Sequence, residues 1–574
     1  MVNSAFRVPR SAFLSLTRVE ATPTERAGPT TDNRAATERG TRNAERGTLV
    51  AIIALAAVVR LWGLGGQPIL YFDSGVYLGE GAFLASAAQR AAAALIGPGP
   101  ANPLERVALA TQDGTDAHPP DIAKPGHAIL LAVSMLLLGK TALAGALVSA
   151  LAGVGTVAAT YAIGLRGWGP RVAIPAAWLL AVSGQHLVYS REPLVEADGL
   201  LFATLAALVY LQARSARSLL AAGVLWGLAF TCNNRLSYLP AVFLIAELAW
   251  WPGVWSVIRR GFLVAPGFVA PLALIEGAYV VARAIGGVAG ARTDWLDYVQ
   301  QLAAFSRMNP PDRVRFDEWP TYFVDLALMD GFGVLALLMI GIGVLVWRLR
   351  RKPTSRADLL LAGSLLVPLA LYSVYSTGEV RLRHFSLALP WVMLAAALAL
   401  DWLARLINDR RRNWILVASM VVLVLATVPR VAALDTAPSG MPAVLDAIAS
   451  GPVASTNGPV LAFYVGEGRT NARLREAFVN VPSDLRDLAQ QYPVLVVDMQ
   501  AEVFAGDLTD LYARTTPRLV VSNGNDAWYL ADLLEHYGVT WGGWNDLLAK
   551  WHANRDAASQ LRVYDLRELA ASVR

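Results

Sequence analysis

The stretch Leu49–Leu64, LVAIIALAAVVRLWGL, is the first long apolar run of the chain and sets the interpretation of the rest. A helix of about 17 to 20 such residues is long enough to cross a bilayer. Ten further apolar runs follow, at about 142–163, 172–188, 197–212, 218–232, 236–251, 261–283, 329–347, 357–375, 384–403 and 413–430. The sequence therefore predicts a polytopic α-helical membrane protein with eleven spans.

The composition agrees with this class. Of 574 residues, 55% are hydrophobic and 16% are charged, whereas soluble domains carry roughly 25% charged residues. This excludes a soluble globular enzyme, a disordered chain and a disulfide scaffold. The single cysteine, Cys232, allows no intramolecular disulfide and no cysteine-based metal site. The net charge of +5 lies in short loops between apolar runs, which is typical of membrane topology, so we expect no nucleic-acid partner.

Loop charges predict the orientation, because cytoplasmic loops are rich in Lys and Arg. The basic loops are Arg166/Arg171, Arg214/Arg217, Arg259/Arg260, Arg348–Arg356 and Arg405–Arg412. The loops 65–125, 189–196, 233–235, 284–328 and 376–383, and the residues after 430, then lie outside. We expect residues 1–46 to be a disordered cytoplasmic tail and 47–430 to be the multi-span domain.

Two segments of the outer region need separate interpretation. Residues 76–96, Ala-rich and amphipathic, are predicted to form a helix at the membrane surface. The run His127–Leu138 is apolar but has only 12 residues, about 18 Å as a helix, too short for a core of roughly 30 Å. We interpret it as re-entrant or part of the outer loop; the alternative is a tilted span, which makes twelve.

Residues 440–574 have a different pattern. Short apolar runs at Val460–Val465, Val494–Asp498, Arg518–Ser522 and Leu561–Tyr564 alternate with helical stretches at Asp484–Gln491 and Ala527–His536. Strands that alternate with helices predict a small α/β domain, which in this topology is extracytoplasmic. No Gly-x-Gly-x-x-Gly follows a strand, so dinucleotide binding is unsupported.

Ionisable residues beside apolar runs are the candidates for function. Asp73, just past the first helix, has a carboxylate that could act as general base on an acceptor hydroxyl or amine; the alternative is the N-cap of the following helix. Lys124 is a compact cation suited to a lipid phosphate, or else a lysine that snorkels at a helix start. His118 in the same loop could be a base or metal ligand, but is more often a plain loop residue.

Further candidates flank later helices. Arg191 precedes Glu196 around a proline, and Glu196 and Asp198 begin the next helix, where acids suit the helix dipole. An outward acidic pair could also hold a divalent ion, although we expect no metal cofactor. Arg235 and Arg383 lie in outward loops, where arginines could clamp phosphate oxygens; arginine at a helix end is also common.

Together these residues resemble a known family. A first helix ends near an acid, and a loop follows with His118-Pro119-Pro120 and Lys124-Pro125. Tyr189-Ser190-Arg191 then stands before Glu196, Gly227-Leu228-Ala229-Phe230 precedes a basic residue, and Arg383-His384-Phe385 precedes Leu389-Pro390. This ordered set, over roughly residues 48–430, is similar to the GT-C glycosyltransferases that use polyprenyl-phosphate sugars, of the protein O-mannosyltransferase and lipid A aminoarabinose transferase type.

The resemblance implies sugar transfer with inversion from a polyprenyl-phosphate donor to a cell-envelope acceptor (lipid, glycan or protein), in the plasma membrane and on its outer face. It implies Asp73 as the catalytic base and Lys124, Arg191 and Arg383 as contacts of the donor phosphate. It also implies a supporting acidic or basic role at the site for four more residues: Glu196, Asp198, Arg235 and His118. The sequence departs from the family at Ser74, where Glu is frequent, at Glu196 for Asp, and at Arg235 for Lys.

Two other classes compete with an enzyme. A transporter or flippase of lipid-linked or sugar substrates often has inverted repeats and charged residues at mid-span; this sequence shows no clear repeat, and its ionisable residues lie at loop level. The second is a non-catalytic scaffold or sugar-binding membrane protein.

Overall fold

The computed structural model describes residues 31–97, 102, 106, 124–250, 253–288, 297–308, 320–351, 355–374, 381–406, 409–448, 451–466, 474–476, 482–504, 511–536 and 543–572. The chain divides into two compact units, Met1–Thr48 and Leu49–Arg574. Helix α2 begins at Thr31, so residues 31–46 are helical and the disorder expected there is wrong. The reason is composition, since Ala, Glu and Arg in this stretch are strong helix formers. Residues 1–30 lie outside the described residues.

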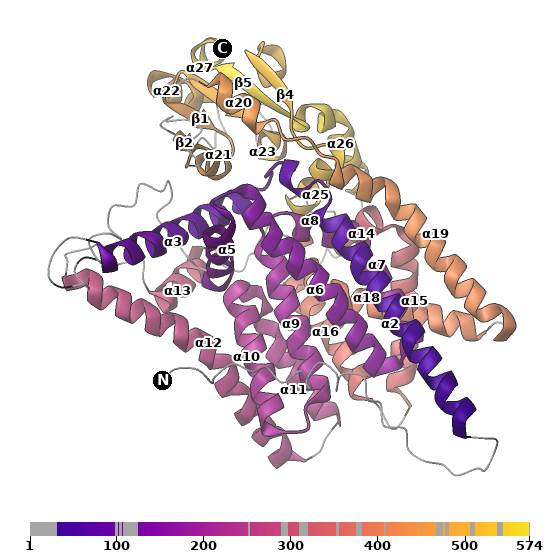
Figure 1. Ribbon diagram of the computed structural model, residues 1–574. Helices are drawn as coiled ribbons and strands as arrows, with labels where there is room; N and C mark the ends of the chain where they lie inside the picture. Colours follow the sequence, from indigo (N-terminus) through magenta and orange to yellow (C-terminus); the bar gives the residue numbers. More distant parts are fainter. Residues whose placement is uncertain are drawn as a thin grey trace. The chain divides into compact units, whose positions relative to one another are not determined.

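The second unit consists of a large helical part and a C-terminal α/β domain (Figure 1). The elements up to Asp435 are all helical: α2 (Thr31–Leu61), η2 (Leu64–Gly66), α3 (Phe72–Ile96), α5 (Pro125–Leu138), α6 (Ala142–Trp168), α7 (Pro170–Ala181), α8 (Gly184–Arg191), α9 (Val195–Gln212), α10 (Ala216–Cys232), η3 (Asn234–Tyr238), α11 (Leu239–Trp250), α12 (Val254–Val288), α13 (Tyr298–Met308), α14 (Pro320–Asp330), α15 (Phe332–Leu349), α16 (Arg356–Val374), α17 (Arg381–Ser386), α18 (Leu389–Arg405) and α19 (Asp409–Asp435).

The described helices include six that are long and apolar enough to cross a membrane, or seven if the bent pair α7 and α8 is one span. The six are Arg46–Gly66, Ala142–Trp168, Val195–Gln212, Val254–Ala284, Phe332–Leu349 and Val417–Asp435. This is fewer than the eleven expected. Several predicted runs form helices shorter than these: α10 and α18 have 17 residues each and α11 has 12. Most of the apolar surface of α18 is buried, whereas α11 leaves Leu244, Ile245 and Leu248 exposed.

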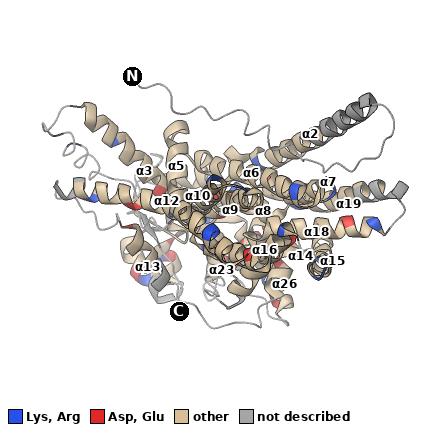
Figure 2. Cartoon of the chain, turned by 90° about the horizontal axis from the view of Figure 1, so that it is seen from below, with Lys and Arg blue, Asp and Glu red and all other residues tan. Residues whose placement is uncertain are grey.

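Charged residues are sparse along the helices, most of which are drawn as other residue types in Figure 2. α6 packs on α7 and α9, α10 on α9 and α12, and α15 on α18. A Cβ on Gly223 of α10 would overlap the carbonyl oxygen of Val264, and one on Gly267 of α12 would overlap that of Leu220. Glycine is therefore required where α10 and α12 cross, as is common where membrane helices approach closely.

The two segments of the outer region that were considered separately, 76–96 and His127–Leu138, are both helical. α3 contains the helix predicted over 76–96 and begins four residues earlier, at Phe72. α5 has 14 residues, about 21 Å, so the short apolar run does form a short helix. α3 and α5 pack on each other, which brings the start of α3 beside the residue that precedes α5.

The C-terminal α/β domain contains a five-stranded sheet in the order β2-β1-β3-β5-β4. β1 is parallel to β2 and β3, and β5 is antiparallel to β3 and β4. Its elements are α20 (Met441–Ala447), β1 (Val453–Ser455), α21 (Gly458–Tyr464), β2 (Leu474–Glu476), α22 (Pro482–Gln491), β3 (Val494–Val497), α23 (Met499–Phe504), β4 (Leu519–Ser522), α25 (Asp526–His536), α26 (Trp544–Ala558), β5 (Gln560–Asp565) and α27 (Leu566–Ala571).

Three of the four predicted strands, β3, β4 and β5, are confirmed, as are the helices α22 and α25. The strand predicted at Val460–Val465 is wrong, because this segment lies in α21, which has a proline in its first turn. Proline is favoured there and starts a helix. A short apolar run buried on all sides cannot be assigned by periodicity alone. The strands β1 and β2 were not predicted.

Candidate active site

Asp73 forms an ion pair with Arg383, which is 310 positions away in the sequence. α3 begins at Phe72 after the extended residue Tyr71, so Asp73 lies within the first turn and the predicted N-cap alternative does not apply. The Asp73 side chain is 37% exposed and that of Arg383 only 4%. The carboxylate is therefore accessible, while its guanidinium partner is held inside the protein.

Lys124 lies close enough to Asp73 to act on its charge. It precedes α5 and its Nζ donates a hydrogen bond to the Tyr77 hydroxyl, one turn of α3 after Asp73. The same ammonium lies 4.9 Å from the centroid of the Tyr77 ring, a cation–π contact. Lys124 is only 5% exposed. The close packing of α3 and α5 thus brings Asp73 and Lys124 to one face of the site.

The acids that begin α9 both have cationic or imidazole partners from other elements. Glu196 accepts a hydrogen bond of 3.0 Å from Arg235 of η3, and Asp198 lies 3.1 Å from the Nδ1 of His127 of α5. These long-range contacts, rather than the helix dipole alone, explain why the two acids are buried. Glu196 and Arg235 also act electrostatically on Lys124 and so belong to the same site.

The charges shift each other's pKa values. Burial by itself raises the pKa of Asp73, but the positive Arg383 and Lys124 outweigh burial and hold this pKa at about 2. Burial, together with Arg235, lowers the pKa of Lys124 to about 8, with Asp73 and Glu196 opposing. Asp73 is therefore ionised at neutral pH, and Lys124 carries its charge at pH 7 and loses it in mildly alkaline solution.

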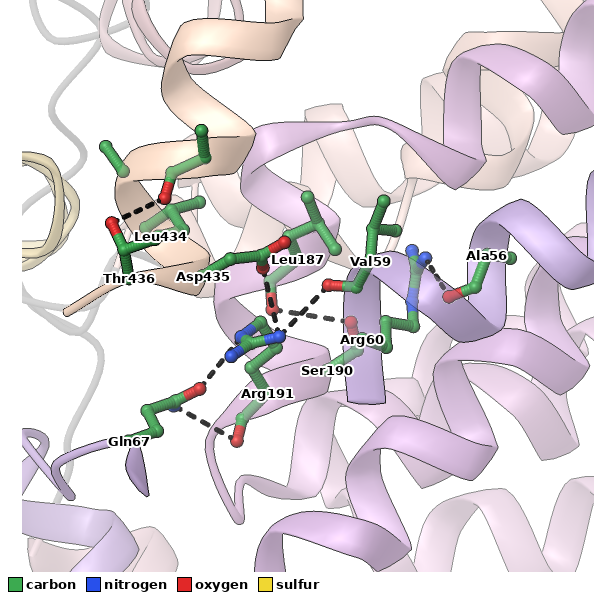
Figure 3. Close-up of polar contacts among 12 residues, drawn as sticks. Ala56, Val59, Arg60, Gln67, Leu187, Ser190, Arg191, Leu434, Asp435 and Thr436 are labelled. Atoms are coloured by element: carbon green, nitrogen blue, oxygen red, sulfur yellow. Dashed lines mark hydrogen bonds and ion pairs between the residues drawn. The ribbon is translucent and has the colours of Figure 1, made fainter. Parts of the chain in front are cut away.

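Arg191, predicted to contact the donor phosphate, lies elsewhere (Figure 3). Its Nε donates to Gln67 at 2.8 Å and its Nη1 to the carbonyl of Val59 at 3.0 Å. The same Nη1 is 3.0 Å from an Asp435 carboxylate oxygen. Arg191 is fully buried, and these contacts tie α8 to the end of α2 and to α19. We call these four residues the Arg191 cluster.

The predicted supporting residue His118 falls outside the residues that the structure describes. Asp198 is paired with His127 as above and is 1% exposed. Among the residues that the structure describes, no group of three or more His, Cys, Asp and Glu side chains is arranged to hold a metal ion.

The sequence did not single out Glu535, which the structure places at the site. Glu535 of α25 forms a second ion pair with Arg383, and it accepts a 3.4 Å hydrogen bond from the Tyr189 hydroxyl. Its helix was predicted, but its charge was not assigned a role. The available signal was an acid in the last turn of an otherwise largely apolar, buried helix, where an ionisable residue is costly unless paired.

We compared the chain with known proteins. Residues 117–276 match the family "dolichyl-phosphate-mannose-protein mannosyltransferase". A search of curated protein sequences finds no match. The fold is similar to the crystal structure of ArnT from Cupriavidus metallidurans in the apo state, with a TM-score of 0.51 and 13% identity over 84% of this chain and 97% of that chain.

Two further solved structures share the fold. ArnT from Cupriavidus metallidurans bound to undecaprenyl phosphate has a TM-score of 0.50 and 14% identity, over 84% of this chain and 97% of that chain. The oligosaccharyltransferase AglB from Archaeoglobus fulgidus, in complex with an inhibitory peptide and a dolichol-phosphate, has a TM-score of 0.51 and 14% identity over 82% of this chain and 72% of that chain. The match of residues 117–276 to this mannosyltransferase family and the shared fold agree with the motifs, and the chain is a multi-pass membrane protein with the fold of these GT-C structures.

Proposed function

We propose that the protein transfers a sugar from a polyprenyl-phosphate donor to a hydroxyl or amine of a cell-envelope acceptor, with inversion at the anomeric carbon. The observation that carries the proposal is the partly exposed Asp73 carboxylate with the cations Arg383 and Lys124 beside it. The matched family and the ArnT and AglB structures, two of them with a polyprenyl phosphate bound, support this donor class.

In the proposed reaction, Asp73 accepts the proton of the acceptor as the acceptor oxygen or nitrogen bonds to the anomeric carbon. The bond from that carbon to the phosphate oxygen breaks on the opposite side, which inverts the centre. Lys124 and Arg383 stabilise the charge of the departing phosphate. Because Arg383 holds the pKa of Asp73 low, a phosphate that takes hydrogen bonds of Arg383 would make Asp73 a stronger base.

The polyprenyl chain needs an apolar path to the site. A narrow hollow with about 10 Å³ of space is lined by residues that include Leu365, His384 and Phe385. We propose that the first isoprene units of the donor lie against this lining, whose side chains move apart to admit them. Its lining is largely aliphatic and aromatic, as is usual for ligand sites of this kind.

The orientation follows from the loop charges. We propose a cytoplasmic N-terminus and an outer location for the α/β domain, in the plasma membrane. The transfer then takes place on the extracytoplasmic face. We propose no metal cofactor, since Lys124, Arg235 and Arg383 already supply positive charge at the site.

The test is transfer of labelled sugar by the purified protein in lipid nanodiscs. Radiolabelled polyprenyl-phosphate sugars, mannosyl donors first, are incubated with cell-envelope acceptors, using wild type and Asp73→Asn. We expect Asp73→Asn to lower kcat by about 10²- to 10⁴-fold, the usual contribution of a general base, while binding of undecaprenyl phosphate persists.

The matched control is Asp565→Asn. Asp565 pairs with the exposed Arg518 on the α/β domain, where a surface ion pair contributes little, so this variant should transfer at the wild-type rate. Transfer that survives in Asp73→Asn would reject Asp73 as the base. Binding of undecaprenyl phosphate without transfer from any donor would reject the enzyme in favour of a transporter or a binding protein.

A further inference from the structure

We propose that the C-terminal α/β domain is part of the catalytic centre, because its Glu535 positions Arg383 and thereby leaves Asp73 able to act as base. This inference rests on the proposed function. Glu535 is then a positioning residue, since it acts on the reaction through Arg383. The role would give the C-terminal domain a direct function in sugar transfer.

The geometry joins two carboxylates to one guanidinium. Arg383 of α17 pairs through Nη1 with Asp73 and through Nε with Glu535. Glu535 is 1% exposed, against 37% for Asp73. The Tyr189 hydroxyl also donates to Glu535 at 3.4 Å. The buried carboxylate is thus the fixed partner of Arg383, and the exposed one is the partner that substrate can reach.

Other contacts of the same domain hold the segment that carries Asp73. Asn457 donates through Nδ2 to the carbonyl of Leu70 at 3.0 Å and to Asp498 at 2.9 Å. The Leu70 amide in turn donates to Glu192 of the helical part at 3.1 Å. Leu70, three residues before Asp73, is therefore fixed from both sides.

The first turn of α3 is also in direct contact with the domain. α21 packs on α3, so closely that a Cβ on Gly75 would overlap the backbone nitrogen of Val460. The Tyr71 ring meets the Trp528 ring edge-on at a centroid distance of 6.3 Å. Glu535 is consequently one of several contacts by which the α/β domain sets the position of the site.

Sharing Arg383 has a consequence for the base. With Glu535 ionised, the positive charge of Arg383 is divided between two carboxylates. With Glu535 neutral, Asp73 is the one of these two carboxylates that is still charged. Arg383 then binds Asp73 more strongly, and proton transfer to Asp73 becomes harder. Neutral Glu535 also removes a negative charge beside the phosphate position, which favours donor binding.

The protonation of Glu535 provides a pH readout. Burial raises the pKa of Glu535 to about 7. The positive Arg383 and His536 act against the rise, and the acids Asp532 and Glu196 add to it. Wild-type kcat should therefore increase as the pH rises through about 7, where Glu535 becomes ionised and takes its share of Arg383.

The experiment compares Glu535→Gln and Glu535→Asp with wild type. The variant Glu535→Gln should lower kcat about tenfold, in the range of one charge-assisted hydrogen bond, without weakening the affinity for undecaprenyl phosphate. The kcat of Glu535→Gln should no longer increase as the pH rises through about 7. Glu535→Asp keeps the charge and should restore part of kcat and the rise.

The stability control is Glu502→Gln, since Glu502 is an equally buried acid of the same domain that pairs with Arg562 instead of Arg383. It should lower the melting temperature as much as Glu535→Gln does, with kcat and its pH profile unchanged. If Glu535→Gln keeps the wild-type kcat and pH profile, the inference is overturned. If kcat and phosphate affinity fall together in both variants, the role is only structural and the inference is overturned as well.

Binding of undecaprenyl phosphate separates this inference from the proposed function. If wild type transfers no sugar from any donor, the proposed function is rejected. The pH dependence of binding still tests Glu535: ionisation near pH 7 should weaken wild-type binding, and the variant Glu535→Gln should lack this change. A change that persists in that variant would overturn the inference whether or not the protein transfers sugar.

Discussion

The Arg191 cluster and the ion pair of Arg383 with Asp73 are both centred on an arginine, and the sequence predicted the same role for the two arginines. Both arginines stand in motifs beside an apolar run, and both join segments that are distant in the chain. Arg191 is fully buried, and its carboxylate partner Asp435 is 11% exposed. Arg383 is also buried, but its partner Asp73 is 37% exposed.

The two arginines differ in the exposure of their partner carboxylates, and we propose that this difference separates a structural arginine from one that contacts substrate. In the Arg191 cluster the guanidinium is used by Gln67, the carbonyl of Val59 and Asp435. In the other site, Asp73 retains access to an incoming molecule. Four predictions test this distinction.

The largest expected effect is on stability, from Arg191→Gln. Loss of the cation leaves Asp435 without its partner in a largely buried cluster, a change that costs about 3–5 kcal/mol. We expect a much lower melting temperature in detergent, with unchanged affinity of the folded fraction for undecaprenyl phosphate. Wild-type stability together with lost phosphate binding would instead assign Arg191 to the donor site, as the sequence predicted.

The matched variant in the other site is Arg383→Gln. A charge-assisted hydrogen bond contributes about 1.5–3 kcal/mol, so affinity for undecaprenyl phosphate should fall roughly 10- to 100-fold. The loss of stability should be smaller than for Arg191→Gln, because Glu535, with a pKa of about 7, can take up a proton. Titration calorimetry and thermal unfolding measure the two effects; unchanged affinity would exclude Arg383 as a donor contact.

The third prediction concerns the close contact between α3 and the α/β domain. Gly75→Ala places a Cβ against the backbone of Val460, and such overpacking costs about 1–3 kcal/mol. Kcat should fall because the turn that carries Asp73 must move. The control is Gly277→Ala, where nothing lies within 4 Å of the added Cβ. Equal kcat and melting temperature in the two variants would contradict a role for this contact.

The smallest effect is a pH dependence that comes from Lys124. Its pKa of about 8 lies below the usual value, so the ammonium loses its proton, and its attraction for phosphate, as the pH rises through 8. Affinity for undecaprenyl phosphate should fall about tenfold between pH 7 and 9. Lys124→Arg keeps its charge over this range and should remove the decline above pH 8, so that only the weaker binding caused by ionisation of Glu535 near pH 7 remains. A decline above pH 8 that persists in this variant would assign it to another group.

The sequence predicted elements well where the local pattern was sufficient. The run Val494–Asp498 and the run Val460–Val465 are both short and apolar, but only the first is a strand. Both runs follow a proline, Pro459 or Pro493, and both are buried, so the local pattern does not separate them. The first run is a strand because it pairs with β1 and β5. Asp73 and Lys124 were also predictable, because an ionisable residue beside an apolar run is costly unless it has a function or a partner.

Glu535 and the role of Arg191 were not predictable from local pattern. Arg383 and Glu535 belong to different parts of the fold, and the described elements between them include six helices, α18 to α23, and four of the five strands. Arg191 has the same motif character as Arg383, and only its buried neighbours show that its contacts are structural. A pairing of this kind depends on which elements pack together, a property of the whole fold.

The sequence by itself determined that the chain is a helical membrane protein with a small α/β domain, because apolar runs of helical length have no stable place in water. It also determined the set of ionisable residues from which a site could be made. The tertiary structure decided which of them meet. Asp73 reaches Arg383 across 310 positions, and the function of a charge depends on its partner and its access to solvent, which only the packing of distant segments sets.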